Sequence, residues 1–262
     1  MPKCINKVIV LDLDDTIGHF EQVSMFLSGL QLIVDKNISD KYLYKLLDLW
    51  PQILRPGIID ILETIGKIKK RNKCVKVIIY TNNMGPRSWT LIIKRYLERK
   101  LKYNIFDKVI TAYRPNKKHN CRTTHSKTYK DLLKCTGYHH DTEFIFLDDQ
   151  MHTEMKHHKI KYLHLHPYTY SIPFNKMITS YLDSKYGKLI KKKYRDRFQE
   201  YMYKYLTSGT GYHKYNVKKT KISKKDIEQM RYIKKHIRKF LNIHDTRHKK
   251  KRKKKNKTRK DY

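Results

Sequence analysis

The stretch Val8-Ile9-Val10-Leu11-Asp12-Leu13-Asp14-Asp15-Thr16 decides the fold of this 262-residue chain. Its first four residues are β-branched or aliphatic, and a short run of this kind that ends in acidic residues is typical of a buried parallel strand. Because Asp12 and Asp14 are two residues apart in the turn that follows, both carboxylates can face one crevice.

Similar apolar runs recur along the chain. Including the first, they cover residues 8–11, 75–80, 106–112, 143–147 and 161–165. The second run ends at Thr81 and the fourth at Asp148-Asp149. Helical patterns separate the runs, and this alternation predicts an α/β fold with a doubly wound parallel sheet. Ligands of such sheets bind outside the carboxyl ends of the strands, where Asp12, Thr81 and Asp148 should meet.

Three helix boundaries are predicted from capping residues. Ser126 can cap a helix over residues 127–135, and Gly137 can end it. Ser223 and Asp226 resemble a capping box. The helix that they open carries its apolar residues on one side and Lys and Arg on the other; the apolar residues are Met230, Ile233, Ile237 and Leu241.

The charge of the chain is strongly basic and unevenly distributed. There are 60 Lys and Arg against 24 Asp and Glu, a formal net charge of +36. Residues 188–262 hold 29 of the basic and 6 of the acidic residues, which gives this part +23. Such a field attracts polyanions, so nucleic acid is an expected partner of the C-terminal region, although solubility and a lysine-rich composition also account for part of the charge.

These features predict three parts. Residues 1–186 form the α/β domain, residues 187–241 a basic helical extension, with 188–206 helical, and residues 242–262 a polybasic tail. The tail should be disordered, because residues 249–255 are seven consecutive Lys and Arg that cannot pack.

Cysteine and apolar content predict the compartment. The four cysteines form no CxxC pair, and a chain of this length should not need disulfides. We therefore expect an intracellular, reducing location. The nucleus and a viral replication site are both compatible with it. The sequence holds no apolar stretch near the roughly 20 residues of a membrane-spanning helix, so no membrane span is expected.

The pair Asp12 and Asp14 suits phosphoryl transfer, which needs a nucleophile and a proton donor for the leaving group. Asp12 would attack phosphorus, and Asp14 would protonate the leaving oxygen and then activate water. Thr16 could fix the turn and orient Asp14. The alternative is an acidic turn without chemistry.

The segment "VLDLDDT" at residues 10–16 resembles the first motif of the haloacid dehalogenase superfamily, and three more motifs follow in order. Thr81 after "VIIY" resembles the second, a lysine at the start of a later helix the third, and Asp148-Asp149 after "FIFL" the fourth. The resemblance implies a phosphatase that forms an aspartyl-phosphate and uses Mg²⁺. It also implies that Thr81 binds the phosphoryl group, with Asn82 in support.

Within that superfamily the chain is most similar to the Fcp/Scp-type phosphatases, also called NLI-interacting-factor-like or C-terminal-domain phosphatases. The similarity covers about residues 5–168 and includes "LRPGIIDILETI", "FDKVITAYR" and "KTYKDLLK", with a composition like that of members from large DNA viruses. It implies a phosphoserine or phosphothreonine protein as substrate, and the short segment between the first two motifs would leave the crevice open to it.

Two segments depart from the Fcp/Scp pattern. Asp15 stands where those enzymes have Glu. The segment "TNNMG" at residues 81–85 is closer to the Thr-Asn-Gln-Met-Gly of polynucleotide 3′-phosphatases. A polynucleotide 3′-phosphatase is therefore an alternative function, and a non-catalytic nucleic-acid-binding module that keeps the fold is a third.

Two lysines compete for the third motif. Lys127 stands where the family's lysine usually opens its helix, whereas Lys130 lies in the Lys-Asp-Leu match; we favour Lys127, which would neutralise phosphoryl and nucleophile charge. For Mg²⁺, the expected ligands are Asp12, the main-chain carbonyl of Asp14 and one of the Asp148-Asp149 pair. By analogy with the family, Asp149 would bind directly and Asp148 would support it.

Overall fold

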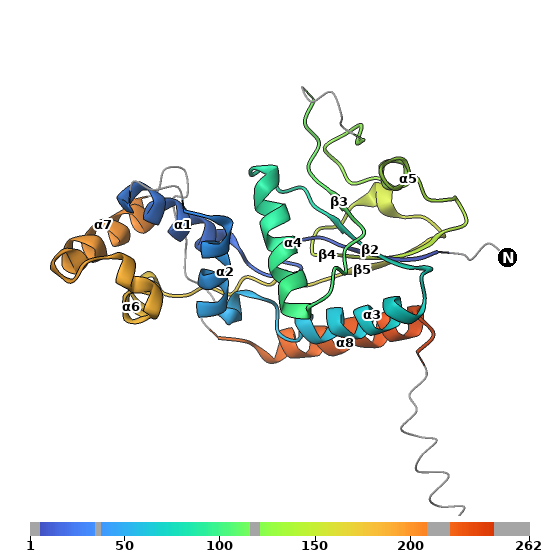
Figure 1. Cartoon of the computed structure of the whole chain (residues 1–262). Coiled ribbons are helices and arrows are strands. Elements are labelled where there is room, and N and C mark those ends of the chain that lie inside the picture. Colours follow the sequence, from blue (N-terminus) through green and yellow to red (C-terminus); the bar gives the residue numbers. More distant parts are fainter. Residues whose placement is uncertain (1–5, 35–37, 116–120, 209–220, 244–262) are drawn as a thin grey trace, which may run out of the picture.

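The computed structural model describes residues 6–34, 38–115, 121–208 and 221–243 (Figure 1). Five strands, eight α-helices and four short 3₁₀ helices make up these residues. In chain order they are β1 (Lys7–Leu11), α1 (Glu21–Val34), α2 (Asp40–Leu49), η1 (Pro51–Ile53), α3 (Ile58–Arg71), β2 (Val75–Tyr80), α4 (Arg87–Leu101), β3 (Lys108–Ile110), α5 (Tyr129–Thr136), β4 (Glu143–Asp148), η2 (Thr153–Met155), β5 (Ile160–His164), α6 (Phe174–Asp183), η3 (Lys185–Leu189), η4 (Lys192–Tyr194), α7 (Arg195–Ser208) and α8 (Lys224–Phe240).

The strands form one sheet in the order β3-β2-β1-β4-β5, and every neighbouring pair is parallel. This confirms the predicted α/β class and is consistent with a doubly wound sheet. Leu11, the last residue of β1, pairs with Ile79 of β2 and Leu147 of β4. Because the three strands end in register, the residues that follow them meet at one edge of the sheet.

Each face of the sheet carries its own hydrophobic core, because successive strand residues point to opposite faces. Ile9 and Leu11 of β1 belong to the larger core, which also takes in α3 and α4. Val8 and Val10 face the other way and pack with Leu132 of α5. Figure 1 shows α3 and α8 on one side of the sheet and α5 on the other. Near-continuous apolar strands are thus explained by burial on both faces.

The C-terminal helices pack into the same core as the sheet domain. Phe198 and Met202 of α7, together with Ile233 and Ile237 of α8, are buried members of the larger cluster. In Figure 1, α7 lies beside α1 and α6, and α8 runs along α3. The apolar packing therefore continues across residue 186, where the sequence suggests a change of character.

Local capping chemistry is confirmed at two of the three predicted sites. Gly137 ends α5 in the left-handed region, at φ 69°. The capping box of Ser223 and Asp226 is present at the start of α8. The prediction for Ser126 is wrong: α5 begins two residues later than expected, and Thr128 caps it by accepting a hydrogen bond from the main-chain N–H of Asp131.

Two further helical segments differ from the sequence-based expectation. The stretch 188–206 is not one helix: η3 and η4 occupy its first part, and α7 begins at Arg195. Helix α6 was not predicted, although it buries Phe174, Met177 and Tyr181.

The expectation that the chain does without disulfides is also wrong. Cys121 and Cys135 form a disulfide with a sequence separation of 14 residues. It joins the segment before α5 to the last turn of that helix. No free cysteine is found among the residues that the structure describes.

Within the described ranges, none of the helices has both the length and the apolar character needed to cross a bilayer. The predicted polybasic tail lies outside the described residues, apart from 242–243.

Candidate active site

A buried arginine stabilises the loop after β1 through hydrogen bonds to main-chain carbonyls. The Arg55 side chain is 1% exposed and donates hydrogen bonds to the main-chain carbonyls of Asp15, Thr16 and His166, at 2.5, 2.6 and 2.9 Å. Asp15 itself has a positive φ of 53°, a conformation that Asp tolerates better than most residues. These contacts fix the turn between Asp12 and Gly18.

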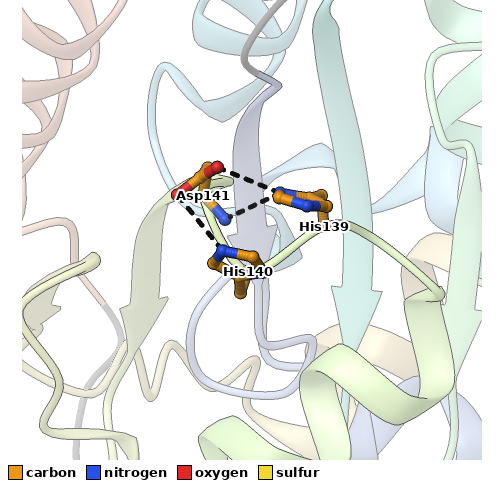
Figure 2. A group of neighbouring side chains, drawn as sticks. All are labelled: His139, His140 and Asp141. Atoms are coloured by element: carbon orange, nitrogen blue, oxygen red, sulfur yellow. Dashed lines mark hydrogen bonds and ion pairs between the residues drawn. The ribbon is translucent and has the colours of Figure 1, made fainter.

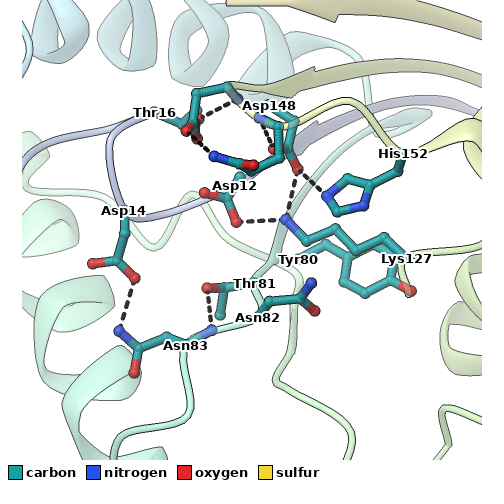
Figure 3. A network of polar contacts seen from close by, with 12 residues as sticks. Asp12, Asp14, Thr16, Tyr80, Thr81, Asn82, Asn83, Lys127, Asp148 and His152 are labelled. Carbon is teal, nitrogen blue, oxygen red and sulfur yellow. Dashed lines mark hydrogen bonds and ion pairs between the residues drawn. The ribbon is translucent and has the colours of Figure 1, made fainter. Parts of the chain in front are cut away.

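Lys127 lies at the centre of the site, between two carboxylates (Figure 3). Its Nζ donates to Asp12 Oδ1 at 2.5 Å and to Asp148 Oδ2 at 2.6 Å. The lysine is 1% exposed, and its Nζ lies 5.7 Å from the ring centroids of both Tyr80 and Phe146. Burial by itself lowers the pKa of Lys127, but the two carboxylates outweigh burial and raise it. The lysine is therefore a fixed positive charge beside Asp12.

The two carboxylates that share Lys127 differ in their electrostatics. Burial, aided by the negative charge of Asp148, raises the pKa of Asp12 to about 8 despite the contact with Lys127. Burial acts in the same direction on Asp148, but contacts with His152, Lys127 and the N–H of Gln150 lower its pKa. Asp148 therefore ionises more readily than Asp12. Asp12 is the carboxylate that further positive charge would ionise.

Asp149 joins the loop after β1 through Thr16. The Thr16 hydroxyl donates to Asp149 Oδ1 at 3.1 Å and accepts from the Asp149 N–H at 3.1 Å. Thr16 thus orients Asp149, where the sequence suggested Asp14. Gln150 Nε2 donates to Asp149 Oδ2 at 3.0 Å, so this carboxylate meets uncharged donors where Asp148 meets a lysine.

Asp12, Asp148 and Asp149 form a buried acidic cluster that could hold a metal ion. One carboxylate oxygen from each residue lies within 4.8 Å of the others. An all-oxygen donor set of this charge fits a hard divalent cation. The three carboxylates predicted as metal ligands thus come together, and the main-chain carbonyl of Asp14 stays a predicted fourth.

Asp14 lies at the mouth of the site and is positioned by the loop after β2. Asn83 Nδ2 donates to Asp14 Oδ2 at 2.7 Å, and the N–H of Asn83 donates to the Thr81 hydroxyl at 3.0 Å (Figure 3). Burial raises the pKa of Asp14 above its ordinary value. A carboxyl that holds its proton more tightly than usual suits a general acid.

Two other predicted residues lie farther from the carboxylates. Asn82 has an exposed side chain whose Oδ1 accepts from Arg122 at 2.7 Å. Arg122 also donates to the carbonyls of His125 and Ser126, just before Lys127. Asn82 therefore takes part in holding the lysine segment. Lys130 is exposed on α5, on the helix surface, and the structure does not bring it to the cluster.

A second group with metal-binding side chains lies elsewhere. His139, His140 and Asp141 are exposed on the turn that precedes β4 (Figure 2). Asp148, by contrast, is the last residue of that strand. Asp141 pairs with His139 Nδ1 at 3.1 Å and with His140 Nε2 at 3.6 Å. The turn is therefore at the opposite edge of the sheet, and the buried cluster alone adjoins Lys127 and Asp14.

Arg55, Asn83, Arg122 and His152 contribute to the site but were not predicted to do so. Asn83 could have been found, because it stands two residues after Thr81 in the same polar turn. Arg55 and Arg122 act through main-chain carbonyls, and His152 acts through Asp148. Sequence spacing does not predict contacts of that kind.

Comparison of the chain with models of protein families, with curated proteins and with solved structures finds no match.

Proposed function

We propose that the chain is a magnesium-dependent phosphatase of the haloacid dehalogenase type, with Asp12 as nucleophile and phosphoserine or phosphothreonine protein as substrate. The observation that carries this proposal is Lys127, buried between Asp12 and Asp148, with Asp149 completing an acidic cluster. A buried lysine that neutralises two carboxylates at the carboxyl ends of parallel strands suits phosphoryl transfer through an aspartate.

The roles of the residues follow from their positions. Asp12 Oδ attacks phosphorus, and the bond to the leaving oxygen breaks as Asp14 delivers a proton to that oxygen. Asp14, now ionised, takes a proton from the water that attacks the aspartyl-phosphate, which releases inorganic phosphate and restores Asp12. Lys127 and the Thr81 hydroxyl stabilise the phosphoryl oxygens. Asn83 holds Asp14 in place between the two half-reactions.

Asp12 and Asp149, with Asp148 in support, would hold Mg²⁺. The ion would neutralise charge on the phosphoryl group and keep Asp12 ionised. Asp148 already meets the charge of Lys127, which favours Asp149 as the direct ligand.

The test is phosphate release, with Mg²⁺ and with chelator, from an aryl phosphate, a phosphoserine peptide and a 3′-phosphorylated oligonucleotide. We expect magnesium-dependent release from the aryl phosphate and the peptide, and none from the Asp12→Asn protein. Full activity of the Asp12→Asn protein would exclude Asp12 as the nucleophile. Preference for the oligonucleotide would favour the 3′-phosphatase alternative, and release from none of the three would favour a binding module.

A further inference from the structure

A cavity of about 410 Å³ opens beside Asp14 and is not explained by the carboxylate cluster. Its walls come from the loop after β1, the first turn of α1, the loop after β2 and the start of α4. Its lining includes three acidic side chains and one indole, which belong to Asp14, Asp15, Glu21 and Trp89.

The position of this cavity relative to Asp14 indicates what it would hold. If Asp14 protonates the leaving oxygen, that oxygen must lie within hydrogen-bond distance of its carboxyl. The rest of the leaving group then extends from Asp14 into the cavity. This step depends on the proposed function, and it makes the cavity the place where the phosphatase would distinguish one phosphomonoester from another.

The cavity is acidic although the whole protein is strongly basic. Asp14, Asp15 and Glu21 place three carboxyl groups on its wall, and His19 Nδ1 lies 2.6 Å from Asp15 Oδ1. Burial is the main cause that raises the pKa of Glu21; the charge of His19 lowers this pKa, and the carboxylates of Asp15 and Asp14 raise it.

The distant positive charges affect this cavity weakly. At physiological ionic strength the screening length is about 8 Å, so the local carboxylates act on a bound group more strongly than lysines on remote helices. Arg114 lies near the rim and donates to the main-chain carbonyls of Met84 and Gly85.

Trp89 adds a second feature that favours a cation. Its indole is partly buried in the cavity wall, and the face of an indole attracts a guanidinium or ammonium group. An aromatic side chain and carboxylates lining the same cavity are a combination that binds Arg or Lys. It disfavours a polynucleotide, whose next phosphate would bring a negative charge towards Asp15 and Glu21.

We propose that this cavity is a subsite for the side chain of an arginine or lysine next to the phosphorylated residue, and that Glu21 determines this preference. The substrate class is then a phosphoserine or phosphothreonine segment with a basic neighbour. Glu21 is the residue to test, because Asp14 has a catalytic role and Asp15 helps to shape the loop.

The experiment compares two phosphoserine peptides of equal length, one with Arg and one with Gln on each side of the phosphoserine. We measure the ratio of their kcat/KM values in the wild type, in Glu21→Gln and in Glu21→Lys. A charge-assisted contact predicts that the wild type favours the Arg peptide about tenfold. The ratio should fall towards one in Glu21→Gln and drop below one in Glu21→Lys.

The matched control is Glu63→Lys, which makes the same charge change at an exposed position of α3 outside the cavity. Its ratio should equal that of the wild type. Because each ratio is taken within one protein, a general loss of turnover cancels. Equal use of both peptides by the wild type, or an equal loss of preference in Glu63→Lys, would overturn the subsite.

Binding separates failure of the subsite from failure of the proposed function. Fluorescence anisotropy of the labelled peptides with Asp12→Asn protein needs no turnover. Tighter binding of the Arg peptide without hydrolysis by the wild type would keep the subsite and reject the phosphatase. Hydrolysis of both peptides with equal affinity would reject the subsite and keep the phosphatase.

Discussion

At the scale of single residues, one lysine occupies the position that the proposed function needs. Lys127 and Lys130 are three residues apart, and both fit the sequence pattern. Only Lys127 is enclosed with Asp12 and Asp148, while Lys130 is exposed on α5. The exposed lysine is solvated, so its charge contributes little to a buried phosphoryl group.

We therefore predict that Lys127→Met lowers kcat/KM for an aryl phosphate by about 100- to 1,000-fold, the loss typical of one fixed electrostatic group. Lys130→Met, the matched control, should stay within about twofold of the wild type. Steady-state kinetics in saturating Mg²⁺ measure both. The substitution of Lys127 also leaves two buried carboxylates without their cation, so thermal unfolding must confirm that the variant is folded at the assay temperature. A large loss in Lys130→Met alone would reverse the assignment.

At the scale of elements, the segment that carries Lys127 is closed by the disulfide between Cys121 and Cys135. Arg122, next to the first cysteine, donates to the carbonyls of His125 and Ser126. The disulfide and these hydrogen bonds thus constrain the same short loop.

Replacing both cysteines by serine should destabilise the protein. A disulfide that closes a loop of this length contributes about 3 kcal/mol to the free energy of unfolding. For a chain of this size that corresponds to a melting temperature lower by roughly 2–4 °C per kcal/mol. Calorimetry of the wild type with and without reductant, beside the double variant, is the measurement. A double variant as stable as the oxidised wild type would show that the disulfide does not contribute to the free energy of unfolding.

Helix α8 is the second element that the structure ties to the domain. Ile233 is fully buried on its inner side, whereas Ile227, on the same helix, is 44% exposed. Ile233→Ala should cost about 2–5 kcal/mol of unfolding free energy, because it leaves a cavity in the core. Ile227→Ala should change it by less than about 0.5 kcal/mol, as is usual for surface positions. Urea unfolding of the two variants gives the comparison, and equal stabilities would mean that α8 does not pack stably in solution.

At the scale of the whole molecule, charge is divided between a basic exterior and an acidic site. The formal charge of +36 lies mostly in the C-terminal part, and α8 presents Lys234, Lys235 and Lys239 on its exposed side. Asp12, Asp148 and Asp149 instead form a buried acidic cluster at the carboxyl ends of the strands. A polyanion and a phosphorylated segment with a basic neighbour would therefore contact different parts of the protein.

Deletion of residues 249–260 removes 10 Lys and Arg from 12 positions. We predict weaker binding to DNA or RNA and a shallower dependence of log K on log salt, because fewer counterions are released. Turnover of an aryl phosphate should not change. Anisotropy titrations of a labelled duplex between low and physiological salt provide the slopes, and an unchanged slope would show that the tail makes no phosphate contacts.

The sequence by itself determined the class of the fold and the members of the carboxylate cluster. Apolar runs that end in Asp12, Thr81 and Asp148 predict a parallel sheet, and parallel strands that end in register bring such residues to one edge. These inferences succeed because they depend on period and order along the chain, which the sequence carries directly. The capping box of α8 was predictable for the same reason, because Ser223 and Asp226 are close together in the sequence.

The tertiary structure decided what depends on contacts between distant segments. It distinguished Lys127, which contacts Asp12, from the exposed Lys130. It also placed Asn83 against Asp14 and Arg55 against the loop after β1. Cys121 and Cys135 were paired in the same way. It also packed α7 and α8 into the core of the sheet domain. Residue type and spacing leave these outcomes open, because a side chain's partner is set by how helices pack on the sheet and by which groups that packing removes from water.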